Sequence, residues 1–258
     1  MSHVTSADGT AIAFETTGTG PALILVDGAM CFRDAGPMRG VAAALADRFT
    51  VHLYDRRGRG ASGDTLPFSV DREVEDLGAL VDAAGGSAAL LGMSSGAALA
   101  TRAAARLGAA VTHLIAYEPP FMPEPARAGA AAYTVALAEA LGHGDLDAAL
   151  AAFFTRVGMP PAGIEAMRAS PAWADNLAIA PTLAYDDAAM GDSSIPAAAG
   201  EVTAPVLALA GSTTPEFLQW GARSLAGAVP NGRFALVEGQ GHAVDPTALA
   251  PLVVGFVA

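Results

Sequence analysis

Lysine is absent from this 258-residue sequence, and cysteine occurs once, as Cys31. The 14 basic residues are therefore all arginine, and against 26 acidic residues they leave a formal net charge of −12. Clustered cationic side chains hold the phosphates of nucleic acids and attract anionic membranes. We therefore expect no nucleic acid and no membrane as partners. A single cysteine also excludes an internal disulfide bond.

Long uninterrupted apolar runs are missing too. Arg102, Arg106 and Gly-Pro pairs break the apolar segments before they reach the roughly 18 residues of a membrane span. The first ten residues contain no basic region followed by an apolar run, so we expect a cytoplasmic protein. Because 52% of the residues are apolar, the chain can bury a large core, and its length suits one large α/β domain.

Short apolar runs alternate with segments of helical period. Residues 70–81 carry valine or leucine every three or four positions, which predicts a surface helix, and a second helix is expected over 95–107. Several apolar runs lack polar alternation, as is typical of parallel strands covered on both faces. The pattern predicts an α/β fold with a mostly parallel central sheet of about eight strands and helices on both faces. The runs of strand length are 11–15, 22–26, 49–54, 87–91, 112–117, 206–210 and 233–237.

The alternation of strand and helix stops after Pro119. The residues that follow carry apolar side chains at fourfold spacing, and Asp145 has the side chain of an N-cap residue for one helix. We expect residues 119–203 to form a helical cap, inserted after the sixth strand. Residues 1–118 and 204–258 are expected to form the α/β core of the same domain.

The most informative motif is Gly92-Met93-Ser94-Ser95-Gly96, a GxSxG pattern between a predicted strand and a predicted helix. In a glycine-rich sequence the pattern alone is a weak signal. Its context makes it specific, because a serine raised on a sharp strand-to-helix turn needs small residues two positions to each side. Gly92 and Gly96 meet that need.

At this motif the sequence resembles the α/β-hydrolase superfamily, in its capped branch with a serine nucleophile, over nearly its whole length. Residues 55–63 are similar to the loop before the nucleophile strand, and Gly239-Gln240-Gly241-His242 is similar to the loop that carries the family's histidine. The resemblance implies that Ser94 is the nucleophile. It also implies that His242 is the base that accepts the serine proton, a task that suits an imidazole near neutral pH.

The resemblance further implies backbone donors for the oxyanion that forms during acyl transfer. Ser95 would supply one N–H group, and Ala29, in the loop Asp27-Gly28-Ala29-Met30, would supply the other. The family usually has His-Gly where this sequence has Asp27-Gly28. A carboxylate near an oxyanion would hinder catalysis unless it pointed away.

The acid that orients the histidine departs from the commonest family pattern. Thr214 stands where an aspartate is usual, and a hydroxyl cannot stabilise an imidazolium as a carboxylate does. Some family members place the acid after the strand that follows the nucleophile helix, where this sequence has Glu118. We therefore predict Glu118 as the acid and keep Glu216 and Asp245 as alternatives. A purely structural role of Glu118 at the cap hinge also stays open.

The residues around these loops predict an apolar pocket for a small-molecule substrate, with Met30, Met93, Phe217 and Trp220 in contact with it. We expect no metal, because no HxH, HExxH or paired-cysteine spacing occurs. We also expect no cofactor, since the GxGxxG-like residues 58–63 do not follow the first strand. At Tyr185, Asp186 and Asp187 we expect a solvated helix face, with polar contacts to the substrate as the alternative. A homodimer is kept as an open alternative.

The resemblance implies a hydrolase that acts on a carboxylic ester, thioester or lactone of a small to medium hydrophobic substrate. Two alternatives stay open. One is a lyase or cyclase on the same fold, in which Ser94 and His242 transfer protons without an acyl-enzyme. The other is a ligand receptor with little turnover. Asp27 and Thr214, which depart from the family pattern, keep both alternatives in view.

Overall fold

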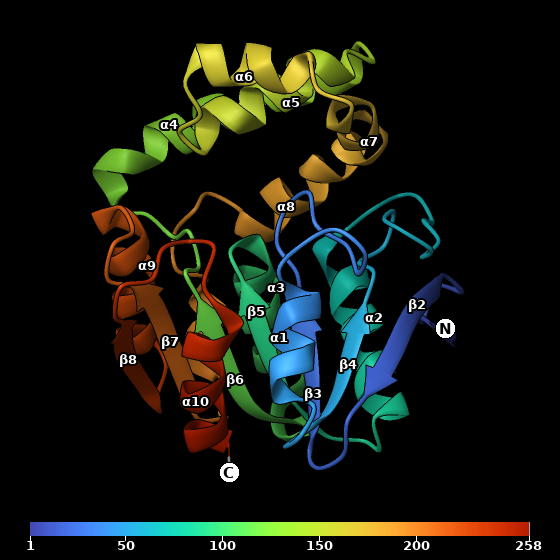
Figure 1. Ribbon diagram of the computed structural model, residues 1–258, viewed down its shortest axis with the longest axis vertical. Coiled ribbons are helices and arrows are strands. Elements are labelled where there is room, and N and C mark those ends of the chain that lie inside the picture. The colour runs from blue at the N-terminus through green and yellow to red at the C-terminus, as the bar shows by residue number, and fades with distance from the viewer. Residues whose placement is uncertain (258) are drawn as a thin grey trace.

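The computed structural model describes residues 1–257, so Ala258, the last residue of the predicted core, lies outside the described residues. An eight-stranded sheet crosses the molecule in the order β1-β2-β4-β3-β5-β6-β7-β8 (Figure 1). β2 pairs antiparallel with β1 and β4, and the other five pairs are parallel. The predicted fold class is therefore confirmed. The strands are β1 (Ser2–Thr5), β2 (Ala11–Thr17), β3 (Ala22–Val26), β4 (Thr50–Tyr54), β5 (Ala88–Met93), β6 (Val111–Tyr117), β7 (Val206–Gly211) and β8 (Gly232–Val237).

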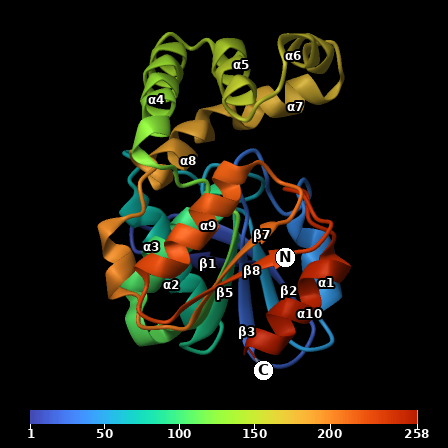
Figure 2. The ribbon, with the colours of Figure 1, turned by 90° about the vertical axis from the view of Figure 1, so that its left-hand side faces the viewer.

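Helices cover both faces of this sheet. Figure 2 shows α2 (Val70–Ala83), α3 (Ser95–Leu107) and α9 (Glu216–Ala228) on one face, and α1 (Met38–Leu45) and α10 (Pro246–Val257) on the other. Successive strand residues point to opposite faces. Leu90 accordingly belongs to one hydrophobic cluster and Leu91 to another. Every residue of β5 and β7 is buried, which explains their uninterrupted apolar sequences.

The chain between β6 and β7 forms a helical layer above the sheet (Figure 1). We call it the β6–β7 segment. Its side chains form a hydrophobic cluster of their own, and the predicted N-cap is present, because the Asp145 carboxylate accepts a hydrogen bond from the Ala148 N–H at 2.9 Å. The division of the chain into core and cap at residues 119 and 203 stays a prediction. The helices of the segment are α4 (Arg127–Gly142), α5 (Leu146–Arg156), α6 (Pro161–Arg168), α7 (Ala172–Ile179) and α8 (Leu183–Met190).

None of the helices in residues 1–257 has the length and hydropathy needed to cross a membrane.

Candidate active site

Ser94 forms the whole turn between β5 and α3. The strand ends at Met93 and the helix begins at Ser95, so Ser94 alone reverses the chain, with φ 55° and ψ −129°. A positive φ is strained for a residue with a side chain, and such strain gathers at functional sites. The turn is held because the Ser94 N–H donates to the carbonyl oxygen of Tyr117 at 2.9 Å.

The glycines on either side of this turn are required by close backbone contacts. A Cβ atom at Gly92 would lie 2.5 Å from the carbonyl oxygen of Gly96. A Cβ at Gly96 would collide with the carbonyl oxygens of Val26 and Asp27. The loop after β3 also approaches the turn, since a Cβ at Gly28 would lie 3.1 Å from the Cβ of Ser94, a tight contact. The GxSxG spacing therefore has the steric cause that the sequence suggested.

His242 contacts a buried carboxylate. Its Nδ1 lies 2.5 Å from Oε2 of Glu118, whose side chain is fully buried at the end of β6. The other oxygen of Glu118 accepts a hydrogen bond from the Gly211 N–H at 2.8 Å. A carboxylate only accepts hydrogen bonds, so Nδ1 carries a proton, and in the neutral imidazole Nε2 then keeps its lone pair. The Tyr117 hydroxyl donates to the Gly241 carbonyl at 2.5 Å and fixes the histidine loop.

The two alternative acids, Glu216 and Asp245, make no hydrogen bond with His242 in the described residues. The Asp245 carboxylate accepts hydrogen bonds from the N–H and hydroxyl of Thr247 at the start of α10. Glu216 is exposed at the first residue of α9. The Thr214 hydroxyl donates to the Gly211 carbonyl at 2.8 Å. Of the three carboxylates considered, Glu118 is the one that contacts His242.

A cavity of about 630 Å³ lies between the strand ends and the β6–β7 segment. Ser94, Ser95, Ala29 and His242 all line it, although they come from three separate parts of the chain. This volume is typical of sites for small molecules. The apolar part of the wall comes from both layers and includes Met93, Pro120, Phe153, Val157, Met190, Phe217 and Leu218.

Two of the four predicted substrate contacts, Met93 and Phe217, line this cavity. Met30 instead packs against the hydrophobic cluster of the β6–β7 segment, and Trp220 packs against the main core. The difference for Trp220 follows from helical geometry: Leu218 lines the cavity together with Phe217, and Trp220, two positions after Leu218 on α9, projects about 160° away from it.

A buried charge network lies behind the loop after β3. The carboxylate of Asp186, on α8, accepts hydrogen bonds from Arg56 and Arg59, each at 2.5 Å. The Ser95 hydroxyl donates to the same carboxylate at 2.8 Å, and Arg59 donates to the Gly28 carbonyl at 2.7 Å. Burial acts to raise the pKa of Asp186, but the two guanidinium groups outweigh it and hold that pKa below its usual value.

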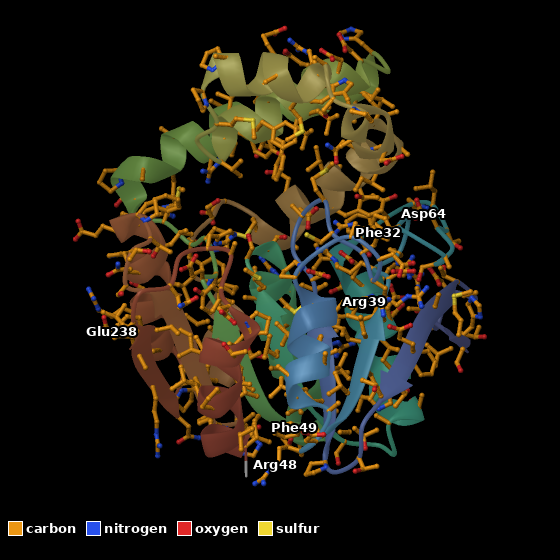
Figure 3. The ribbon with its side chains drawn as sticks, viewed as in Figure 1. Phe32, Arg39, Arg48, Phe49, Asp64 and Glu238 are labelled. Carbon is orange, nitrogen blue, oxygen red and sulfur yellow. The ribbon has the colours of Figure 1, made fainter. Side chains whose placement is uncertain are left out.

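The expectation of a solvated helix face at Asp186 is therefore wrong, because the residue is buried. The run Arg56-Arg57-Gly58-Arg59 was the available signal, since arginines that follow a buried strand need carboxylates as partners. A second hydrogen bond joins the loop after β4, which carries these arginines, to α8. The Tyr185 hydroxyl donates to Asp64 at 2.7 Å, and Figure 3 labels Asp64 on the loop that follows β4.

Asp27 is the unusual charged group of the site. Its side chain is buried in the cavity wall, and within residues 1–257 neither of its oxygens has a hydrogen-bond partner. Burial raises the pKa of Asp27 to about 7, against the opposing effect of Arg59 and Arg56. The carboxyl group therefore changes charge near neutral pH, in the loop that adjoins Ser94.

This raised pKa predicts a pH-dependent stability. The folded chain binds the Asp27 proton more tightly than the unfolded chain, so the wild type loses stability as the pH rises from about 4 to about 7. Asp27→Asn removes the charge, and the free energy of unfolding of the variant is expected to exceed that of the wild type by up to about 4 kcal/mol above neutral pH. Urea unfolding at several pH values between about 5 and 8 measures the difference. A difference that stays constant over this range would contradict the prediction, and the exposed Asp82→Asn variant serves as the control.

Within residues 1–257, no group of three or more His, Cys, Asp or Glu side chains is placed to hold a metal ion.

A scan against protein-family models matches residues 19–252 to the alpha/beta hydrolase family. The structure is similar to that of an alpha/beta hydrolase from Sphaerobacter thermophilus DSM 20745, with 42% identity, complete coverage of both chains and a TM-score of 0.88. It is also similar to a hydrolase from Pseudomonas aeruginosa PA01, with 24% identity, a TM-score of 0.78, and coverage of 100% of this chain and 98% of that one. An enol-lactonase from Burkholderia xenovorans LB400 has 20% identity, a TM-score of 0.72 and coverage of 99% of each chain. The last two similarities, below 25% identity, concern the fold alone.

Two curated proteins are similar to parts of the sequence. The polyketide synthase ThaQ of Burkholderia thailandensis is 32% identical over 93% of this chain, which corresponds to 12% of the synthase. The pimeloyl-[acyl-carrier protein] methyl ester esterase of Nitrosomonas europaea is 35% identical over 40% of this chain and 39% of the esterase. The chain thus spans well under two thirds of the length of either curated relative.

Proposed function

Because the chain belongs to the alpha/beta hydrolase family, we propose that it hydrolyses a carboxylic ester, thioester or lactone of a small to medium hydrophobic substrate. The observation that carries the proposal is the contact between His242 and the buried Glu118, in the wall of the same cavity as Ser94. The name of an esterase among the curated relatives supports the reaction class. The substrate itself depends on the side chains that the β6–β7 segment contributes.

In the proposed reaction, Nε2 of His242 accepts the proton of the Ser94 hydroxyl while the serine oxygen attacks the carbonyl carbon. Glu118 holds the imidazole in the required tautomer and stabilises the imidazolium. The carbonyl oxygen becomes negative, and the backbone N–H groups of Ala29 and Ser95 stabilise it. The bond to the alcohol or thiol then breaks, and the leaving group takes the proton from His242.

The second half of the reaction restores the enzyme. A water molecule attacks the acyl group on Ser94, and His242 accepts its proton. The ester bond to the serine oxygen breaks, the carboxylic acid leaves, and the proton returns to Ser94. The β6–β7 segment acts in this proposal as a cap that limits the access of water to the acyl-enzyme.

The test of this function is covalent labelling with a fluorophosphonate, read by intact mass. An activated serine is expected to take up one label, and Ser94→Ala is expected to take up none. Ser95→Ala is the matched control, because its hydroxyl points to Asp186 and its loss leaves the Ser94 hydroxyl in place. A wild type that takes up no label would contradict the proposal and favour the receptor alternative.

Acyl-enzyme trapping separates hydrolysis from the lyase or cyclase alternative. His242→Ala lacks the base of both half-reactions, so the trap uses the wild type: an acid quench during turnover of a reactive aryl ester is expected to leave a mass increase of one acyl group on Ser94. A lyase that uses Ser94 and His242 only for proton transfer would form no such adduct, and its absence during measured turnover would favour that alternative.

A further inference from the structure

Arg156 is a cation in the cavity wall that the proposed reaction does not use. It is the last residue of α5 and half-buried. In the part of the chain that the structure describes, its guanidinium has no carboxylate within 4 Å. Its one side-chain hydrogen bond there is donated to the sulfur of Met122 at 3.3 Å. A thioether is a weak acceptor, so most of its five N–H donors await a better partner.

The fully buried arginines among the described residues are paired with acids, whereas Arg102, half-buried like Arg156, donates to the Ala189 carbonyl oxygen. Arg56 binds Glu73 at 2.8 Å, and Arg57 binds Asp76 at 2.7 Å. Burial lowers the pKa of Arg156, against the smaller opposing effects of Tyr133 and Asp187. A cation withdrawn from water without an anion destabilises the fold, and such groups are typical of sites where a ligand supplies the counter-charge. A position at a helix C-terminus is favourable for arginine, but an exposed side chain would serve that purpose equally well.

The acidic groups of the cavity do not neutralise Arg156. Asp186 is already paired with Arg56 and Arg59. Asp187 accepts a hydrogen bond from the Thr134 hydroxyl at 3.1 Å, and burial raises its pKa. The pKa of Asp27, raised by burial to about 7, leaves that group partly neutral near neutral pH. One cation therefore remains available in a wall that is otherwise largely apolar.

The placement of Arg156 relative to Ser94 defines the shape of a ligand. Ser94 lies at the end of β5, at the floor of the cavity, and α5 lies in the layer above it (Figure 1). The apolar side chains of Phe153, Val157 and Met190 line the same cavity. A molecule that reaches both groups needs a carbonyl at one end, an apolar middle and an anion at the other end.

We propose that Arg156 binds a carboxylate at the end of the substrate remote from the reacting carbonyl. This inference rests on the proposed function and narrows its substrate class to half-esters or thioesters of dicarboxylic acids. A carboxylate suits the site better than a phosphate, because its single charge matches one guanidinium and its planar shape allows two parallel hydrogen bonds. A doubly charged phosphate would leave excess negative charge beside Asp187.

The test compares two aryl esters of equal length. One is the mono-p-nitrophenyl ester of adipic acid, which carries a free carboxylate, and the other is its terminal amide, which is neutral. The wild type is expected to prefer the acid over the amide in kcat/KM by about 10- to 100-fold, the contribution of a charge-assisted hydrogen bond. Arg156→Met is expected to bring this ratio near one, mainly through KM, and Arg156→Lys is expected to keep an intermediate ratio.

Two control variants separate local binding from general electrostatics. Arg106→Met makes the same change in net charge at an exposed position on α3, and it is expected to keep the wild-type ratio. Asp187→Asn removes a negative group beside Arg156 and is expected to increase the preference for the acid. If Arg156→Met and the wild type have the same ratio, the carboxylate proposal is overturned while the hydrolase proposal stands.

A binding measurement keeps the inference testable if neither ester is hydrolysed and fluorophosphonate leaves Ser94 unlabelled, a result that would reject the proposed function. Free adipate at millimolar concentration is expected to raise the melting temperature of the wild type more than that of Arg156→Met, because ligand binding stabilises the folded state. Equal shifts for the two proteins, or no shift for either, would overturn the role of Arg156 independently of catalysis.

Discussion

Replacing Ser94 with alanine is expected to lower kcat for ester hydrolysis by about 10⁴- to 10⁶-fold. In the proposed mechanism the hydroxyl is the protein group that forms a bond to the acyl carbon, and alanine cannot replace it. The substitution removes one oxygen atom at a half-buried position, so the turn and the cavity are expected to persist. The loss should therefore appear in kcat, while the affinity for substrate changes little.

Stopped-flow measurement of p-nitrophenolate release tests this expectation. The wild type should show an initial burst if deacylation is the slower step, and Ser94→Ala should show none. Ser95→Ala, which removes a neighbouring hydroxyl, is expected to keep most of the activity of the wild type. A Ser94→Ala variant that retains more than a hundredth of the wild-type kcat would show that another group attacks the carbonyl.

Glu118→Gln is expected to lower kcat by about 10²- to 10⁴-fold, the effect of losing the acid in related serine mechanisms. Glutamine is nearly the same size as glutamate, and its carbonyl oxygen can accept the hydrogen bond from the Gly211 N–H. The amide nitrogen then faces His242 as a donor, which favours the opposite tautomer of the imidazole and leaves no charge to stabilise the imidazolium.

Matched variants show whether the loss of kcat in Glu118→Gln comes from the missing carboxylate or from a damaged fold. Glu216→Gln and Asp245→Asn remove the other two acids considered, and both are expected to keep kcat within about threefold of the wild type, as exposed substitutions usually do. Denaturant unfolding of Glu118→Gln should give a stability close enough to the wild type to exclude unfolding at the assay temperature. Unchanged turnover in this variant would leave Glu118 with a structural role at the end of β6.

Sequence periodicity was sufficient to predict those elements whose structure is determined by their own residues. The helix predicted over residues 70–81 is α2, and the glycines around Ser94 placed the turn between β5 and α3. The choice of Glu118 came from the family resemblance, because some members place the acid after the strand that follows the nucleophile helix, and that strand is β6. β1 escaped prediction, since its residues Ser2–Thr5 are mostly polar and this edge strand is defined by its pairing with β2.

Contacts between distant segments were not predictable from local patterns. Asp186 pairs with Arg56 and Arg59, which lie 130 and 127 positions away in the chain. Next to Asp187, it has the sequence of a solvated helix face, and only the packing of α8 against the loop after β4 buries it. Arg156 likewise stands out only in the folded chain, where it lines the cavity that the β6–β7 segment completes from above.

The charge network beneath α8 also bears on how a substrate enters. Separating Asp186 from its two arginines would leave buried charges without partners, at a cost of about 3 to 5 kcal/mol, and the bond between Tyr185 and Asp64 would break as well. At this cost the separated arrangement would make up less than about a hundredth of the molecules at equilibrium. We therefore expect a substrate to enter without displacement of α8, which stays a fixed wall of the cavity.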